Sequence, residues 1–223
     1  VVAERRAETD ALRMWHLDQD VAIVSFRTKQ HTIGDDVLDG MLRALDEAER
    51  GFAGLVIWQT KEPFSFGANL ATLAPAVQSG RWDTVEAVVA RFQQTSLRLR
   101  YSLIPTVAAV RGMALGGSCE FIMHCDRAVA ALESYVGLVE AGVGLFPGGG
   151  GTKEFAVRAA DAVKQGPTGG QADHFPFLRA SFQTIAMATV AKSALEAKAL
   201  GFLRNADVVV THPHEILHVA IGQ

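Results

Sequence analysis

Hydrophobic and polar residues follow two alternating periods along the chain, and each change of period marks a predicted element. Residues 14–18 and 21–26 alternate between apolar and polar positions, which predicts two strands joined by a tight turn at 18–20. Between about 35 and 50 the apolar residues recur at helical spacing behind two aspartates, either of which can cap the helix. The chain thus opens with a strand pair followed by an amphipathic helix.

The same two periods predict the elements of the rest of the chain. Strands are predicted at 54–60, 106–110, 126–131 and 206–211, and helices at 83–101, 118–124, 152–163, 173–191 and 193–200. Residues 4–13 are predicted to form a charged surface helix, 71–81 a mobile segment and 164–172 a loop. The order strand, strand, helix recurs about four times, which predicts an α/β domain of stacked ββα turns rather than a simple doubly wound sheet.

Composition excludes several classes of function. The chain has 223 residues, of which 49% are hydrophobic and 20% charged, as in a soluble domain with a sizeable core. Its formal net charge of -3 argues against a general nucleic-acid or membrane-surface binder. Charged residues interrupt every apolar run that could suggest a signal peptide or membrane span. Cys119 and Cys125 indicate a reduced, cytoplasmic protein, and their spacing is not that of metal ligands.

Glycine follows a predicted strand in three places, at 67–68, 116–117 and 148–151. Taken singly, each is explained by a turn. However, the second and third each open a predicted helix, where bare N–H groups and the helix dipole favour negative charge. Glu120 and Glu140 lie beside these two turns in apolar sequence. Because burying a carboxylate is costly without a purpose, we infer that the two glutamates share a site.

Four segments resemble the enoyl-CoA hydratase/isomerase (crotonase) superfamily in their order and spacing. They are Phe-Ser-Phe-Gly-Ala-Asn-Leu at 64–70, the run from Pro105 to Glu120, the run from Glu140 to Thr152, and residues 193–203. The resemblance extends from about residue 21 to residue 210. It implies a spiral of ββα turns, which agrees with the order of the predicted elements.

The resemblance also implies a role for each matching position. The backbone N–H groups of Ala68 and Gly117 would form an oxyanion hole for an acyl-thioester carbonyl, and Glu120 and Glu140 would hold one water between them. Further substrate contacts are implied at Gly67, Asn69, Leu70, Gly116, Pro147 and Gly148. The partner is an acyl-CoA thioester. No metal or separate cofactor is implied, because CoA is part of the substrate.

Hydration of a conjugated enoyl thioester explains why these groups are needed. The reaction passes through an enolate-like state, so the carbonyl oxygen needs N–H donors, and water and the α-carbon need a base and an acid. Glu120, near a helix N-terminus, is expected to stay ionised and to act as the base. Glu140, among apolar residues, is expected to have a raised pKa and to act as the acid. The two would titrate as a coupled pair.

The chain departs from the family pattern in several places. Asn69 stands where Asp is common, and Ser118 where a third glycine is common. Residues 164–191 are longer and more aromatic than in a short hydratase, and the C-terminal helices that complete the acyl pocket and trimer contacts are largely missing. Both ends look cut, so we expect a single crotonase-like domain (1–223) from a longer polypeptide. It is similar to the hydratase part of a multifunctional 3-hydroxyacyl-CoA dehydrogenase, and we expect a homo-oligomer at full length.

Three other motifs carry weaker hypotheses. Residues 116–120 begin like the G-x-S-x-G nucleophile elbow but end in Glu120, and no His/Asp partners are identifiable. Residues 148–153 place lysine after threonine, so they fail the order of a phosphate-binding loop. His212, His214 and His218 could suggest a metal site, but we interpret them as chain-end residues.

The sequence therefore predicts an enoyl-CoA hydratase domain acting in fatty-acid β-oxidation. A Δ3,Δ2-enoyl-CoA isomerase, which moves a proton with one glutamate, is the alternative within the enzyme class. From a different class, the domain would be a non-catalytic acyl-CoA-binding or oligomerising part of a larger chain.

Overall fold

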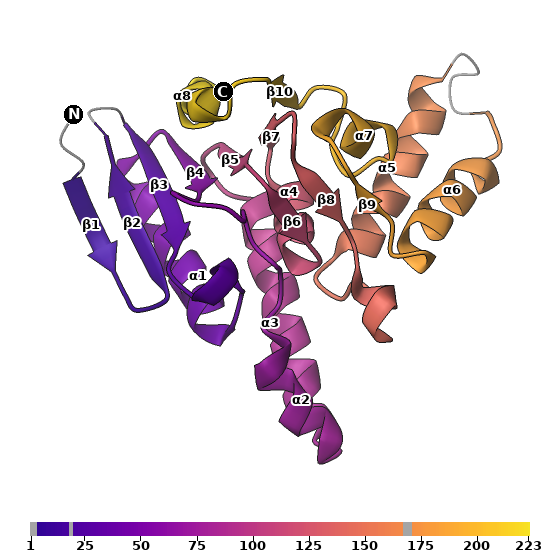
Figure 1. Cartoon of the computed structure of the whole chain (residues 1–223), viewed down its shortest axis with the longest axis horizontal. Helices are drawn as coiled ribbons and strands as arrows, with labels where there is room; N and C mark the ends of the chain where they lie inside the picture. Colours follow the sequence, from indigo (N-terminus) through magenta and orange to yellow (C-terminus); the bar gives the residue numbers. More distant parts are fainter. Residues whose placement is uncertain (1–3, 18–19, 167–170) are drawn as a thin grey trace.

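Strands and helices alternate along the chain in a computed structural model that describes residues 4–17, 20–166 and 171–223. The strands of the larger sheet are β1 (Glu4–Glu8), β2 (Leu12–His16), β3 (Val21–Phe26), β4 (Gly54–Trp58), β5 (Thr106–Val110), β7 (Arg127–Ala131) and β10 (Val208–Val210). Those of the smaller sheet are β6 (Met113–Leu115), β8 (Tyr135–Gly137) and β9 (Val190–Ala191). Figure 1 shows the two sheets side by side, with the helices around them.

The helices are α1 (Asp35–Gly51), α2 (Leu70–Gln78), α3 (Trp82–Arg100), α4 (Gly117–His124), α5 (Gly151–Gln165), α6 (Phe175–Ala186), α7 (Ala194–Ala199) and α8 (Ile216–Ile221). Short 3-10 turns are η1 (Lys29–His31), η2 (Glu140–Val143) and η3 (Pro213–Glu215). The α2–α3 hairpin projects away from the sheets in Figure 1. No helix of the described residues combines the length and the apolar content that crossing a membrane requires.

Within the described residues, the larger sheet has seven strands in the order β1-β2-β3-β4-β5-β7-β10. β1, β2 and β3 pair antiparallel, and the strands from β3 to β10 pair parallel. One register row runs through Val24, Ile57, Ala108 and Ala128, all of which are buried. Parallel strands covered on both faces read as continuous apolar runs, which is why β4 and β5 could be predicted without an alternating pattern.

Two apolar clusters cover the two faces of this sheet. On one face the strands pack with α1, α4 and Phe92 of α3 in the larger cluster. On the other face Val107, Ala109 and Val129 pack with Ile216 and Ala220 of α8. Neighbouring residues of one strand thus belong to different clusters, as the two-residue period of a strand requires.

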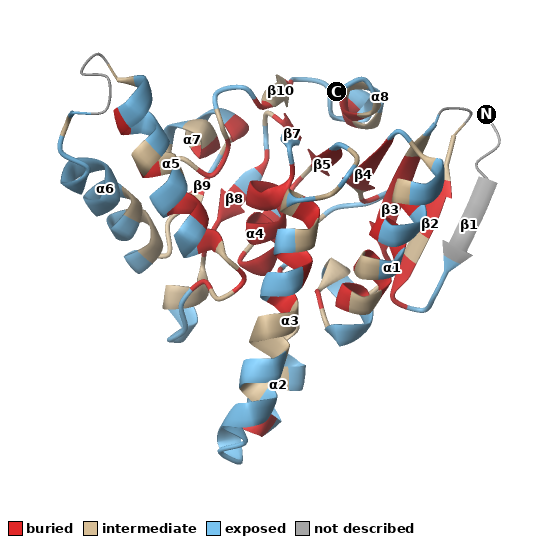
Figure 2. Ribbon diagram, turned by 180° about the vertical axis from the view of Figure 1, so that it is seen from behind, coloured by how far each residue is buried: buried red, intermediate tan, exposed pale blue. Residues whose placement is uncertain are grey.

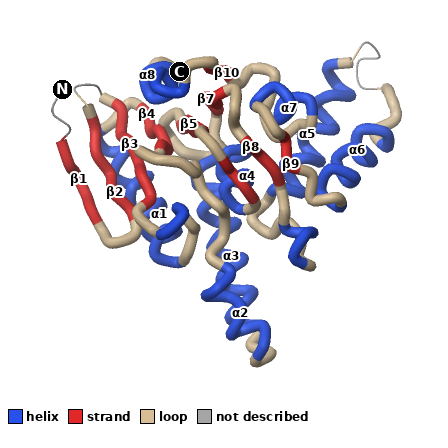
Figure 3. The backbone as a smooth tube through the Cα atoms, viewed as in Figure 1, coloured by secondary structure: helices blue, strands red, loops and turns tan. Residues whose placement is uncertain are grey.

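The chain winds as a spiral in which each turn adds a strand to the larger sheet, a segment to the smaller sheet and then a helix. β5, β6 and α4 form one turn, and β7, β8 and α5 form the next. Earlier turns contribute only isolated parallel bridges, between Ile33 and Ala68 and between Ser65 and Ala114. The predicted ββα rhythm is therefore observed, and Figure 3 shows its strands in red.

Helix α4 lies in the interior of the spiral. Every residue from Gly117 to His124 is buried, and Figure 2 shows the helix in red at the centre of the molecule. Such a helix has no solvent-facing side, so each polar side chain it carries must find a partner inside the protein. Glu120 and His124 are therefore the residues whose surroundings need explanation.

The structure corrects several sequence predictions. Residues 4–13 do not form a helix: β1 pairs antiparallel with β2, and this pairing outweighs the local helix propensity. Residues 71–78, for which no helix was predicted, form most of α2, and Asn69 caps this helix by accepting from the N–H of Ala71 at 3.2 Å. The helix predicted to reach residue 191 ends at Ala186, before Ala188 with its positive φ of 48° and strand β9.

Other boundaries agree within a few residues, and β6, β8, β9 and α8 were not predicted. The predicted turn at 18–20 falls mainly on residues 18 and 19, which lie outside the described residues. Residues 167–170 of the predicted loop at 164–172 also lie outside them.

We expect Gly137→Ala to destabilise the chain by about 1–3 kcal/mol, because extra atoms would have to enter a close-packed contact. A Cβ at residue 137 would lie 2.7 Å from the carbonyl oxygen of Thr189 and 3.0 Å from the Cα of Val190, where β8 pairs with β9. Urea unfolding measures the change. Gly51→Ala is the matched control, since nothing lies within 4 Å of its Cβ position. Equal stability of the two variants would contradict the packing argument.

Candidate active site

Successive turns of the spiral bring three distant segments together at the ends of the smaller sheet's strands. Gly67 and Ala68 follow the Ser65 bridge, Gly116 and Gly117 follow β6, and Glu140 follows β8. Gly67 has a φ of +82°, and a Cβ there would lie 2.8 Å from the Gly117 nitrogen and collide with the Leu115 carbonyl. Glycine is required at residue 67 by both its conformation and this close approach.

Two backbone N–H groups meet at this contact. The Ala68 nitrogen lies 3.4 Å from the position that a Gly117 Cβ would occupy. Within the described part of the chain, neither of these N–H groups donates a hydrogen bond, although the N–H groups of Gly116 and Asn69 bond to Gly137 and Ile33. Since α4 begins at Gly117, its N–H is one of the unpaired donors of a helix's first turn. The predicted pair of donors is thus brought together.

Glu120 is buried, and its carboxylate is held by the opening of the next helix. Its Oε2 atom accepts from the N–H of Gly149 at 3.0 Å, and its Oε1 atom accepts from the N–H of Gly151 at 2.8 Å. Gly150, between them, has a φ of +112°, which turns the chain into α5. The carboxylate therefore lies at the N-terminus of α5 rather than at that of its own helix.

Burial raises the pKa of Glu120 to about 7, and the negative charge of Glu140 contributes in the same direction. The N–H groups of Gly151 and Gly149 lower the pKa only in part. Glu120 was expected to stay ionised near a helix N-terminus, but desolvation outweighs the hydrogen bonds, so its pKa is raised rather than lowered. Near neutral pH both forms of this carboxyl group are populated.

Glu140 is the second carboxyl group of the site. Its Oε1 atom lies 3.2 Å from the position of a Gly116 Cβ, beside the N–H donors. Its Oε2 atom is buried and has no hydrogen-bond partner among the described residues. Burial raises the pKa of Glu140, as predicted, against the effect of the N–H groups of Glu140 itself and Val139.

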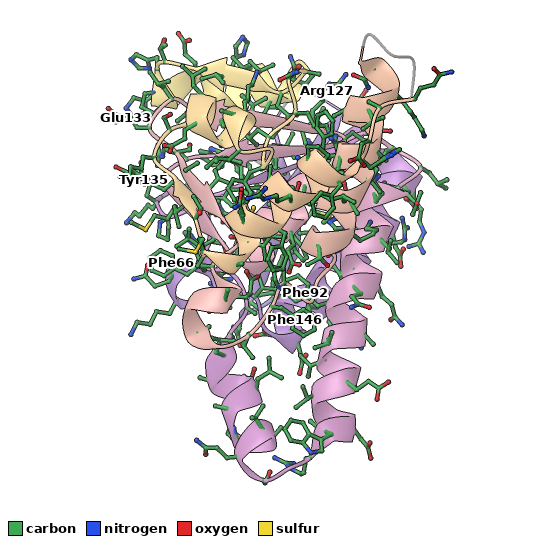
Figure 4. The ribbon with its side chains drawn as sticks, turned by 90° about the vertical axis from the view of Figure 1, so that its right-hand side faces the viewer. Phe66, Phe92, Arg127, Glu133, Tyr135 and Phe146 are labelled. Atoms are coloured by element: carbon green, nitrogen blue, oxygen red, sulfur yellow. The ribbon has the colours of Figure 1, made fainter. Side chains whose placement is uncertain are left out.

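Phe92 of α3 packs against both glycine turns. Its Cζ atom lies 2.5 Å from the Cβ position of Gly117, and its Cδ1 atom lies 2.6 Å from that of Gly149. The ring is buried and lies 5.1 Å from that of Phe121, centroid to centroid. In Figure 4 Phe92 points inward from α3, near the label of Phe146. A Cβ at either position would require the Phe92 ring to move.

The remaining predicted contacts lie at the edge of this arrangement. Asn69 caps α2 with its side chain, and Leu70 is an exposed residue at the start of that helix. Pro147 is buried, and the carbonyl of Gly148 accepts from the side chain of Gln93 at 2.7 Å. The Asn69 side chain is thus engaged by α2, whereas Gly148 leads directly into the turn that holds Glu120.

Sequence reasoning missed Gly149 and Gly151 as carboxylate ligands, and it missed Phe92 and His124. The glycine run was recognised as a helix opening, but only the fold shows which side chain it faces. His124 carried a signal, because it follows Glu120 by four positions on one apolar helix. Phe92 carried none, since it reads as one more apolar position of an amphipathic helix.

The described residues give no support to a serine nucleophile or a metal site. The Ser118 hydroxyl lies 2.8 Å from the carbonyl oxygen of Ser65 and 2.9 Å from that of Leu115, so backbone groups engage it rather than a base. The described residues contain no group of three or more His, Cys, Asp or Glu side chains that could hold a metal ion. Cys119 and Cys125 are free and buried.

Comparison with known proteins gives the family. The family model for enoyl-CoA hydratase/isomerase matches residues 17–164. A probable 3-hydroxyacyl-CoA dehydrogenase of Bacillus subtilis (strain 168) is 38% identical over 216 residues, covering 96% of this chain and 26% of that protein. The chain belongs to the enoyl-CoA hydratase/isomerase family, that is, to the crotonase superfamily.

Other relatives match over shorter lengths. A putative fatty acid oxidation complex trifunctional enzyme of Rickettsia felis is 34% identical over 152 residues, covering 68% of this chain and 21% of that protein. The chain thus spans only about a quarter of the length of these two curated relatives.

Solved structures confirm the predicted fold. The enoyl-CoA hydratase of Bacillus anthracis superposes with a TM-score of 0.75 at 22% identity, covering 95% of this chain and 74% of that one. An enoyl-CoA hydratase of Geobacillus kaustophilus HTA426 gives a TM-score of 0.77 at 18% identity, covering 98% and 74%. At these identities the likeness concerns the fold alone.

We expect Glu140→Gln to lower the pKa of Glu120 below about 7, because the negative charge of Glu140 is one of the causes that raise it. The ¹³C chemical shift of the Glu120 carboxyl carbon, followed against pH without substrate, measures this pKa. Glu133→Gln is the control, since Glu133 is exposed and lies far from Phe92 in Figure 4. An unchanged titration in Glu140→Gln would mean that the two carboxyl groups do not interact.

Proposed function

We propose that the chain hydrates 2-enoyl-CoA thioesters, adding water across the conjugated double bond. The observation that carries this proposal is a pair of carboxyl groups, Glu120 buried and Glu140 half-buried, beside two unpaired backbone N–H groups. Isomerisation needs one group to move a proton, whereas hydration needs a base for water and an acid for carbon. Two carboxyl groups with different surroundings fit the second requirement.

The N–H groups of Ala68 and Gly117 would receive the thioester oxygen. During addition, negative charge develops on that oxygen as an enolate-like state forms. Fixed donors in a water-poor site stabilise such charge strongly, and losing one donor costs roughly 2.7–4 kcal/mol in other enzymes. The N-terminus of α4 adds a favourable dipole at Gly117.

The proton balance assigns the two carboxyl groups different tasks. Ionised Glu120 takes one proton from water while the water oxygen bonds to the β-carbon. Protonated Glu140 gives its proton to the α-carbon as the enolate collapses. Each Glu120 oxygen accepts one N–H but keeps a second lone pair for the water proton. The product is a 3-hydroxyacyl thioester, and exchange of one proton between the two groups restores the starting state.

The surroundings of the site favour an apolar acyl chain. Phe66 immediately precedes Gly67, and Val143, Leu145 and Phe146 lie between Glu140 and Gly148. All four side chains are exposed, which is unusual for such a concentration of large apolar residues. Figure 4 labels Phe66 and Phe146 below Tyr135, in the part of the view that also holds Phe92. An acyl chain entering between the glycine turns would cover part of this surface.

The name of the Rickettsia felis relative supports a reaction within fatty-acid oxidation. We propose that the chain supplies a 3-hydroxyacyl-CoA product to a dehydrogenase reaction, as the combination of names among its relatives suggests. The proposal includes a cytoplasmic, homo-oligomeric full-length protein that uses CoA only as part of its substrate.

We expect Glu120→Gln and Glu140→Gln each to lower kcat for crotonyl-CoA hydration by roughly 10²–10⁴-fold, the usual contribution of a positioned acid or base. Loss of the conjugated enoyl-thioester absorbance follows the reaction. Glu47→Gln, an exposed change on α1, is the control.

Near-normal hydration by both site variants would refute the proposed roles. A wild-type chain that instead generates this absorbance from a 3-enoyl-CoA would be an isomerase. Binding of acyl-CoA without either change would indicate the non-catalytic alternative.

We expect Gly67→Ala to lower kcat by about 10²–10³-fold, because its Cβ would push the Ala68 and Gly117 donors apart. Gly80→Ala is the matched control: Gly80 also has a positive φ, of +66°, but only the Trp82 side chain comes as near as 4.0 Å. Equal loss of activity in both variants would mean that backbone strain, rather than donor geometry, is responsible. Steady-state kinetics with crotonyl-CoA makes the comparison.

A further inference from the structure

His124 is a fully buried imidazole at the end of α4, and the proposed reaction does not use it. Its Nδ1 atom lies 2.7 Å from the carbonyl oxygen of Glu120. A carbonyl only accepts, so Nδ1 carries the proton. Burial, followed by the charges of Lys153 and Arg100, lowers the pKa of His124 to about 4 against the opposing effects of the Glu120 carbonyl and Glu154. The ring is therefore neutral near pH 7.

The imidazole also contacts the turn that holds the Glu120 carboxylate. Its Cε1 and Nε2 atoms lie 2.8 and 2.9 Å from the position that a Gly150 Cβ would take. Gly150 is the residue with a φ of +112° whose two neighbours donate to the carboxylate. The His124 ring thus bonds to the backbone of Glu120 and also packs against the Gly150 turn, which holds the Glu120 side chain.

Glu154 fixes the other side of this arrangement. Its N–H bonds to the carbonyl of Gly150 at 3.0 Å, and its buried carboxylate lies 3.8 Å from Nε2 of His124. Lys153 and Arg100 approach the same carboxylate at 2.8 and 3.4 Å. Among the described residues Nε2 has no hydrogen-bond partner. Burying an unpaired nitrogen costs free energy, and an apolar side chain at residue 124 would avoid that cost. Packing alone therefore does not explain why a histidine stands here.

We propose that His124 is a positioning residue, whose neutral ring keeps the N–H groups of Gly149 and Gly151 on the Glu120 carboxylate. This inference rests on the proposed role of Glu120 as the base, but the geometry it describes exists without substrate. Loss of the ring would let the Gly150 turn relax, and the ionised carboxylate would then lose hydrogen bonds.

The test is His124→Met in the 223-residue chain, because Met fills a similar volume without the N–H donor. We expect the apparent pKa of Glu120 in the ¹³C titration to rise by about 1, since fewer donors stabilise the ionised form. For hydration we expect kcat near pH 7 to fall about tenfold, with KM within about twofold. Met123→Leu, a buried change on the same helix, is the control and should alter neither value.

Three results would overturn the proposal. The first is a folded His124→Met variant with unchanged Glu120 titration and kcat, which would make the ring a space filler. The second applies if His124→Met does not fold. In that case an unchanged Glu120 titration and an unchanged kcat in His124→Asn, which keeps a donor but not the ring, would overturn the proposal. The third is ¹⁵N NMR of the unaltered chain showing His124 protonated at Nε2 at pH 7. If the unaltered chain does not hydrate crotonyl-CoA, the proposed function fails, while the carboxyl titration still decides the role of His124.

Discussion

The two hydrogen bonds from Gly149 and Gly151 to the Glu120 carboxylate are the interaction on which the site depends. A bare carboxylate inside α4 would be strongly unfavourable, and each hydrogen bond to a charged group returns only about 1.5–3 kcal/mol. The compensation is partial, which is why the pKa of Glu120 is raised to about 7 rather than lowered. Incomplete compensation leaves a carboxyl group that can exchange a proton near neutral pH, as a general base requires.

The site around this carboxylate forms because the turns of the spiral stack on one another. Gly67, Gly117 and Glu140 lie far apart in the sequence, yet each ends the smaller-sheet segment of its own turn. Parallel pairing in the larger sheet fixes the advance from one turn to the next. The glycines then allow backbone to meet backbone, and Phe92 fills the space beside two of them. Strand pairing brings the three segments to one place, and the glycine contacts set the distances between their backbone atoms.

The sequence predicted those parts of the structure that depend on local pattern. Strand β5, helix α4 and the opening of α5 follow from apolar runs and paired glycines, and the resemblance singled out Glu120 and Glu140. Residues 4–13 were wrongly predicted, because a strand's partner decides its state more than its own propensity. The pKa of Glu120 was misjudged for a similar reason: the helix dipole is visible in a sequence, but the degree of burial is not.

The unequal surroundings of the two carboxyl groups give a physical reason for dividing their tasks. Burial raises the pKa of both groups, so the pair resists carrying two negative charges at once. The single charge is best placed where fixed donors stabilise it. Glu120 accepts two N–H groups, whereas the Oε2 atom of Glu140 accepts none among the described residues. The hydrogen bonds from the glycine turn favour placing the charge on Glu120, which is the assignment that the proposed hydration uses, whereas the burial of Glu120 and the negative charge of Glu140 oppose it.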